Sequence, residues 1–167
     1  MSGFQRNSIG ALMLTAMLGS GCAYSFSSGL PSHIRTVAVP LFANETSEFG
    51  IAEEITDQLV AELVRDGTLR VVADENEASS VLLGTVRVYS EQPRSFDRQE
   101  NVDQFIIQIT LDVRFQDRVR DEILWESSSV HGSAVYPNEG PEARALGLER
   151  AIDQAVQEVL SGVVAGW

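Results

Sequence analysis

The feature that most constrains the fold is an alternation of apolar and polar side chains across residues 105–115, in which only Ile106 departs from the pattern. In a β-strand successive side chains point to opposite faces, so a period of two predicts a strand with one buried face. The buried face would carry Phe105, Ile107, Ile109, Leu111, Val113 and Phe115, and the polar face Gln108, Thr110, Asp112 and Arg114. The polar face is either plain solvent surface or a contact surface for a partner.

Two further segments have the period of an α-helix. Between residues 51 and 63 an aliphatic side chain recurs at every fourth position, with acidic residues between. We expect this helix to begin near Ser47, capped by Thr46 or Ser47, and to end at Gly67. The second helix opens at Pro141, a residue that suits the first helical turn. Its apolar stripe is Ala145, Leu148, Ile152, Ala155, Val156, Val159, Leu160 and Val163.

The remaining pattern predicts one α+β domain over residues 34–167. Strands are expected at 34–39, 81–89 and 123–136 besides the one at 105–115, with a brief extended piece at 69–73 and polar loops at 41–46 and 90–101. The element order is then β-α-β-β-β-α, with a parallel crossover first and an antiparallel meander after it. We therefore expect a two-layer sandwich, in which two helices cover one face of a mixed four-stranded sheet.

The N-terminal segment has the features of a lipoprotein signal peptide. It carries one positive charge, Arg6, and then an apolar stretch of about ten residues. That stretch has the length of a signal-peptide core and is too short for a membrane span, which needs about 20 residues. Small residues lead directly to Cys22, the only cysteine, although Gly19 stands where an aliphatic residue is usual. We therefore expect cleavage after residue 21, lipid attachment at Cys22 and a tether over residues 22–33.

The expected destination is the outer membrane of a Gram-negative cell, on its periplasmic side. Position 23 is Ala, whereas many bacterial lipoproteins retained at the inner membrane have Asp there. Acylation of Cys22 with palmitate-type chains would hold the protein stably, because two or more chains anchor where one does not. The alternative is an ordinary secreted protein in which Cys22 is incidental.

Composition excludes several functional classes. The chain has 12 basic residues, all Arg, against 24 acidic ones, and its net charge of −12 disfavours nucleic acid as a partner. With one Cys and two His, no disulfide framework and no metal site is expected. His33 and His131 are expected at surface or edge positions. Ser127–Ser129 lacks the Gly-x-Ser-x-Gly context of a nucleophile, so we expect a protein without catalytic activity and without a cofactor.

One predicted loop carries a local positive charge in this acidic chain. Arg94 and Arg98 flank Phe96 within residues 90–101. Arginine binds phosphate groups in a bidentate manner, so the three side chains are candidates for contact with an anionic lipid or with a protein wall. A solvated loop of mixed charge is the alternative interpretation.

Several segments, taken in order, resemble the LptE family of lipoproteins that assist lipopolysaccharide assembly. The resemblance covers about residues 22–167, and residues 34–46 are its most specific part. It is carried by Gly21–Phe26, by Ile34–Thr46, by Tyr89, Pro93 and Asp97, by Leu124–Glu126 with Gly132 and Tyr136, and by the closing Val163–Trp167.

The resemblance implies a specific role. Members of the family sit at the inner leaflet of the outer membrane and plug the lumen of the LptD β-barrel, which places lipopolysaccharide on the cell surface. Basic residues near one end of the sheet contact lipopolysaccharide in some members, and Arg94 and Arg98 occupy a comparable loop here. The expected partners are thus an LptD-type barrel, lipopolysaccharide and the outer membrane. The alternative function is a lipid-anchored periplasmic adaptor that binds other envelope proteins.

Overall fold

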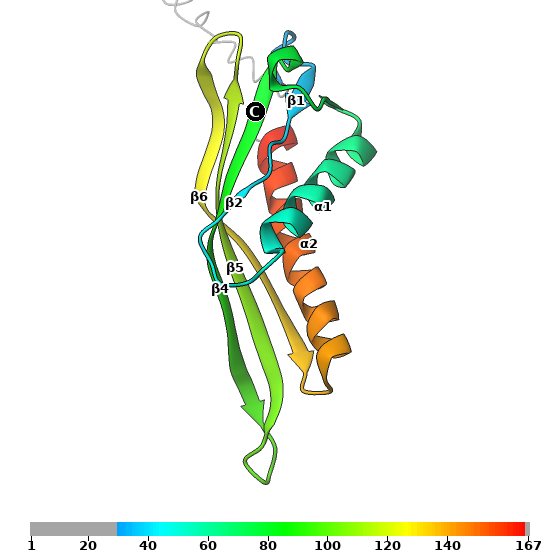
Figure 1. The fold of residues 1–167 in the computed structure, drawn as a ribbon, viewed down its shortest axis with the longest axis vertical. Helices are drawn as coiled ribbons and strands as arrows, with labels where there is room; N and C mark the ends of the chain where they lie inside the picture. The colour runs from blue at the N-terminus through cyan, green and yellow to red at the C-terminus, as the bar shows by residue number, and fades with distance from the viewer. Residues whose placement is uncertain (1–29, 166–167) are drawn as a thin grey trace, which may run out of the picture.

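The computed structural model describes residues 30–165, in two layers with both helices on one side of a long sheet (Figure 1). The predicted signal peptide and the predicted lipid attachment site Cys22 lie outside the described residues. Contacts with the domain begin within the predicted tether, because Leu30 already packs against the core. Within residues 30–165, no helix is both long enough and apolar enough to cross a membrane.

The sheet has the order β3-β1-β4-β5-β6, with β2 beside β4. β1 runs parallel to β3 and β4, whereas β4, β5 and β6 form an antiparallel meander. This confirms the α+β class, and two strands of two residues each bring the expected four strands to six. The elements are β1 (Thr36–Ala38), β2 (Ala43–Asn44), α1 (Ile51–Asp66), β3 (Arg70–Val71), η1 (a 3₁₀ turn, Glu75–Glu77), β4 (Ser80–Phe96), β5 (Val102–Asp117), β6 (Glu122–Pro137) and α2 (Pro141–Ala165).

Strand β5 has the two faces that its alternation predicts. Gln108 and Arg114 are exposed on the face without helices, and Thr110 and Asp112 are half-buried there. The opposite face forms the centre of the core, where the apolar side chains are at most 1% exposed: Ile107, Ile109, Leu111, Val113 and Phe115.

Helix α2 packs very closely on the sheet. A Cβ atom at Gly132 of β6 would lie only 2.0 Å from the backbone oxygen of Ala151 in α2, so only glycine allows this approach. Most of the predicted apolar stripe of the helix is buried, namely Ile152, Ala155, Val156, Val159 and Val163. Leu148 and Leu160 are half-buried, and Ala145, in the first turns of the helix, is exposed.

The predicted start of the first helix is wrong, whereas its end is confirmed. Helix α1 begins at Ile51, after Gly50 with a φ of 80°, and no side chain caps it. The reason lies in the preceding loop, where the Asn44 side chain accepts from the Thr46 backbone N–H and donates to the Glu48 carbonyl. This local bonding holds the chain out of helical conformation until Gly50. At the other end Gly67 has a φ of 74° and donates to Leu63, as a left-handed cap does.

The predicted polar loop at residues 90–101 is also wrong. β4 continues to Phe96 and β5 begins at Val102, so the turn comprises only residues 97–101. The end of the β4–β5 hairpin that carries this turn extends beyond the helix layer (Figure 1). Both faces of this hairpin end are largely open to solvent, so its strands do not require alternating apolar residues. Its polar sequence is therefore typical of a loop.

Candidate functional site

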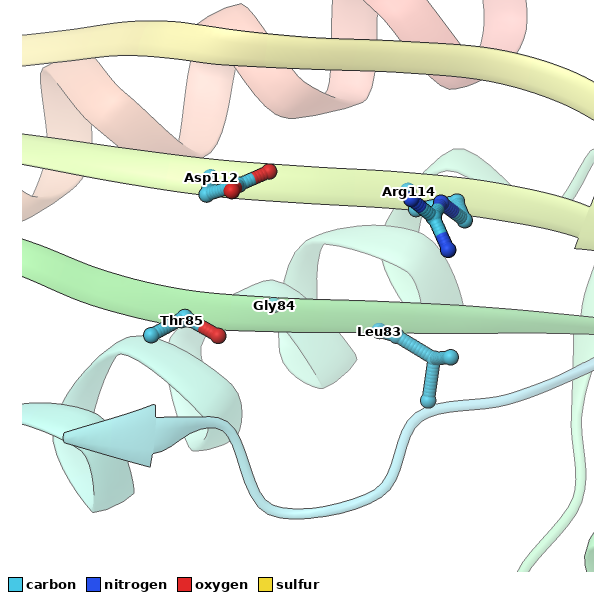
Figure 2. Close-up of a pocket in the computed structure, with 5 residues that line it drawn as sticks. All are labelled: Leu83, Gly84, Thr85, Asp112 and Arg114. Atoms are coloured by element: carbon cyan, nitrogen blue, oxygen red, sulfur yellow. The ribbon is translucent and has the colours of Figure 1, made fainter.

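One face of the sheet is not covered by either helix (Figure 1). Figure 2 shows it with both helices behind the strands and with Asp112 and Arg114 in front of them. A shallow hollow of about 200 Å³ lies here, lined by Leu83, Gly84, Thr85, Asp112 and Arg114. A hollow this open does not enclose a small molecule, but a broad polar face can lie against another protein.

Charges on the open face are largely paired with one another. Arg87 forms ion pairs with Glu45 and, at 3.3 Å, with Asp112. Arg114 lies 3.4 Å from Glu126 on the neighbouring strand. Exposed pairs of this kind contribute little stability. They do leave the face polar without a strong net charge, which favours contact with a hydrated wall over binding of a highly charged ligand.

The hairpin end joining β4 to β5 brings the three candidate contact residues together. Arg94 lies near the end of β4, Phe96 is its last residue, and Arg98 is in the turn, so Arg94 belongs to a strand and not to a loop. Phe96 is 61% exposed. Within the described residues neither guanidinium forms an ion pair, in contrast to Arg87 and Arg114. These two cations are therefore the ones available for an anionic partner at this end.

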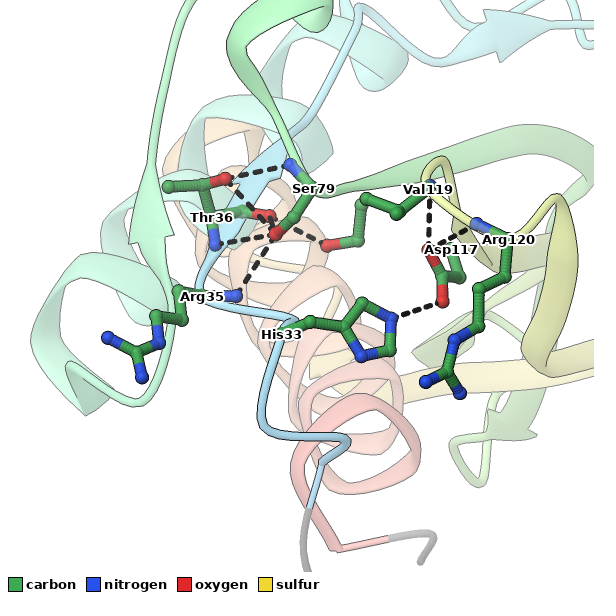
Figure 3. Close-up of polar contacts among 8 residues, drawn as sticks. His33, Arg35, Thr36, Ser79, Asp117, Val119 and Arg120 are labelled. Carbon is green, nitrogen blue, oxygen red and sulfur yellow. Dashed lines mark hydrogen bonds and ion pairs between the residues drawn. The ribbon is translucent and has the colours of Figure 1, made fainter.

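The opposite end of the sheet is organised by Asp117, which sequence reasoning missed. Its side chain is fully buried, and Oδ2 accepts from His33 Nε2 at 2.6 Å (Figure 3). Oδ1 accepts from the backbone N–H groups of Val119, at 2.7 Å, and Arg120, at 3.1 Å. Burial alone would raise the pKa of Asp117, but the His33 and backbone hydrogen bonds outweigh it and lower the pKa. The sequence contained a signal for this burial, because Asp117 lies two residues after Phe115 and therefore points to the same, buried face of β5.

A second cluster missed in the sequence lies at the lower end of the helix layer. Arg144 of α2 donates to Glu91 at 2.9 Å, to Glu48 at 3.0 Å and to the Tyr89 hydroxyl at 2.8 Å. The hydroxyls of Tyr89 and Tyr136 donate to Glu91. The cluster joins α2 to β4, to β6 and to the loop before α1, and it closes the core where the hairpin leaves the helices.

The titration of this cluster follows from its bonding. Burial would raise the pKa of Glu91, yet the hydrogen bonds from Tyr136, Tyr89 and Arg144 together lower it. Burial and the bond to Glu91 raise the pKa of Tyr136 to about 12. The sequence did contain a signal for this cluster, because Arg144 lies four residues before Leu148 on the apolar stripe of α2. A cation on such a stripe indicates a buried partner.

The two histidines differ in their surroundings. His131 is exposed near the edge of the sheet, as expected, with Nδ1 3.2 Å from the Thr110 hydroxyl. His33 is half-buried against Asp117, with 26% of its side chain still exposed at the surface. Across residues 30–165, no group of three or more His, Cys, Asp or Glu side chains is placed to hold a metal ion.

The helix-on-sheet architecture recurs in solved structures at low sequence identity. An uncharacterized lipoprotein B from Nitrosomonas europaea aligns with a TM-score of 0.55 and 13% identity, over 82% of this chain and 90% of its own. A PelC dodecamer from Paraburkholderia phytofirmans aligns with a TM-score of 0.52 and 20% identity, over 81% and 93%. At these identities the likeness shows the fold alone. None of the curated proteins compared with the chain matches it.

The fold thus defines a small helix-on-sheet domain with one broad polar sheet face that no helix covers. The sequence model of the LptE family, described as lipopolysaccharide-assembly, matches residues 34–162. This is well over half of the chain, so the protein belongs to the LptE family of lipopolysaccharide-assembly proteins.

Proposed function

We propose that the protein is a lipid-anchored outer-membrane lipoprotein that assists lipopolysaccharide transport and assembly as the plug of an LptD-type β-barrel. Membership of the LptE family over residues 34–162 carries this proposal. In this role the protein acts by binding and positioning, without catalysis.

The open sheet face suits the lumen of a barrel. Lumens of large outer-membrane barrels are polar and hydrated, whereas their outer surfaces are apolar. A face with paired charges such as Arg87–Asp112 and Arg114–Glu126 can lie against such a wall without burying an unpaired charge. β4 alone spans about 55 Å, at roughly 3.3 Å for each of its 17 residues, which exceeds the thickness of a bilayer core.

Purification of the lipidated protein from outer membranes tests the plug role. We expect a large β-barrel to co-purify, and a charge introduced on the open face, as in Gln108→Glu with Thr110→Glu, to weaken that association. The matched control places the same charges at exposed positions of α2, as in Gln157→Glu with Ser161→Glu. Co-purification of other envelope proteins without a barrel would instead support the periplasmic adaptor.

The anchor at Cys22 is tested separately. Cys22→Ala should give either a soluble periplasmic protein or an uncleaved precursor, because the acyl chains have no other attachment site. Membrane fractionation with metabolic palmitate labelling measures this. Wild-type protein without label, or Cys22→Ala protein with label, would contradict lipid attachment at this residue.

The hairpin end with Arg94, Phe96 and Arg98 is proposed to contact lipopolysaccharide or the barrel wall. Charge-assisted contacts to phosphate contribute about 1.5–3 kcal/mol each, so Arg94→Glu with Arg98→Glu should weaken lipopolysaccharide binding at least about tenfold. Binding isotherms at low and physiological salt measure the effect, and a thermal melt confirms folding. The control reverses two arginines of the helix layer, Arg65→Glu with Arg150→Glu. Equal affinities for the two double variants would remove this end from lipopolysaccharide binding.

A further inference from the structure

The turn between β5 and β6, residues 118–121, presents an apolar side chain between two cations. Val119 is 68% exposed, and Arg118 and Arg120 flank it. Ile123, at the start of β6, is 51% exposed and adds further apolar surface near the turn. The two backbone hydrogen bonds to Asp117 Oδ1 hold the turn in one shape, so Val119 is presented by a preformed structure.

The same aspartate fixes the place where the chain enters the domain. His33 donates to the other oxygen of Asp117, across 84 residues of sequence. Nearby, the Ser79 hydroxyl accepts from the backbone N–H groups of Arg35 and Thr36, both at 3.0 Å (Figure 3). The first residues of the domain are therefore bonded directly to the base of the turn.

This entry point lies close in sequence to the proposed lipid. His33 follows Cys22 by 11 residues, which span at most about 40 Å even when fully extended. The hairpin end with Phe96 lies at the far end of the sheet (Figure 1), a further 55 Å or so along β4. Of the two ends of the sheet, only the β5–β6 turn is thus held near the bilayer by the anchor.

We infer that the β5–β6 turn is a second membrane contact, which places Val119 in the headgroup region of a glycerophospholipid bilayer. The inference rests on the proposed anchoring at Cys22. Amphipathic arginine side chains place their charge at lipid phosphates while their stems cover apolar surface. A weak contact of this kind gains strength when an acyl chain already holds the protein at the surface.

The charges around the turn show which cation is available. Arg118 is 3.2 Å from Glu75, and the Asp121 side chain accepts from Gln116 at 2.7 Å. Arg120 forms no ion pair within residues 30–165, and its backbone N–H is already satisfied by Asp117. Because Glu122 and Asp121 follow closely, the contact is shallow and local, with Val119 as its apolar element and Arg120 as its phosphate-binding element.

A fluorescent label at position 119 tests this contact in the complete lipidated protein. Cys22 is the only cysteine and its thiol would carry the lipid, so Val119→Cys provides a single thiol for an environment-sensitive dye. The protein is anchored in vesicles of phosphatidylethanolamine and phosphatidylglycerol. We expect a blue shift of the dye emission and its quenching by lipids that carry a nitroxide near the headgroup. The control is Leu146→Cys, an exposed apolar residue in the first turns of α2, which lie toward the far end of the sheet (Figure 1), and its dye should remain in water.

Flotation of the vesicles separates the possible failures. Protein that floats while the dye at position 119 shows neither shift nor quenching would overturn the membrane contact and leave the anchor intact. Equal quenching at positions 146 and 119 would also overturn it, since the domain would then lie along the bilayer. Protein that does not float would contradict the anchoring itself and the inference with it. A thermal melt of each labelled variant confirms that the domain is folded.

Discussion

The two hairpin ends of the long sheet use the same turn chemistry in different surroundings. At one end Asp97 accepts from the backbone N–H groups of Gln99, at 2.8 Å, and Asn101, at 2.9 Å. At the other end Asp117 accepts in the same way from Val119 and Arg120. Each turn also contains one non-glycine residue with positive φ, Glu100 at 63° and Asp121 at 55°.

The difference lies in what surrounds the aspartate. Asp97 is exposed, and the backbone hydrogen bond from Asn101 is the main reason that its pKa is lowered. Asp117 is fully buried, and its pKa is lowered only because the hydrogen bonds from His33 and the turn outweigh the effect of burial. A local motif thus shapes both turns, but tertiary contact makes one of them part of the core. The Asp97 end remains free for a partner, and the Asp117 end is tied to the start of the domain.

The largest expected effect comes from a charge placed in the core between the two ends. Leu111→Asp should destabilise the domain by roughly 3–5 kcal/mol, because it buries an unpaired carboxylate in the central strand. Thr110→Asp, one residue away on the open face, is the matched control and should have a much smaller effect. Chemical denaturation of soluble domains measures both. A larger loss for Thr110→Asp would mean that the two faces of β5 are assigned the wrong way round.

A smaller effect separates the two turns directly. Asp117→Ala leaves His33 and two turn N–H groups without their acceptor, so we expect a loss of about 1–3 kcal/mol in the free energy of unfolding. Asp97→Ala removes the equivalent acceptor at the exposed turn, where water replaces it, and should have the lesser effect. Urea denaturation of both variants provides the comparison. Equal losses would show that burial of Asp117 adds nothing to its role in the turn.

The smallest effect is in the pH dependence of stability. The folded-state pKa values of Asp117 and Glu91 are lowered from their ordinary values of 3.8 and 4.5. The stability that they contribute is therefore fully present above those ordinary values and is lost as the pH falls through the lowered ones. Asp117→Asn should flatten the loss of stability below about pH 3.8, and Glu91→Gln should flatten it below about pH 4.5. Denaturation midpoints measured between neutral and acidic pH test this, and wild-type slopes in both variants would contradict it.

The sequence by itself determined those helices and strands that bury one face between the sheet and the helix layer. The alternation of β5, the apolar stripe of α2 and the Gly67 cap were all predictable, because each depends on spacing within one segment. The α+β class and the family followed from the order of such segments. The limits of β4 were not predictable in this way, since its polar end, from residue 90 onward, pairs with β5 where the cover of the helices ends and no periodic pattern is required.

Only the tertiary structure decided which polar groups are buried and which ends of the sheet are held. Arg144 meets Glu91 and Glu48 across 53 and 96 residues of sequence, and His33 meets Asp117 across 84. A carboxylate on the buried face of a strand, or a cation on the apolar stripe of a helix, indicates that the charged side chain needs a partner. The sequence does not identify that partner. That identity depends on chain segments brought together by strand pairing and helix packing. Folding therefore decides that one hairpin end joins the core while the other, with the same turn chemistry, stays free.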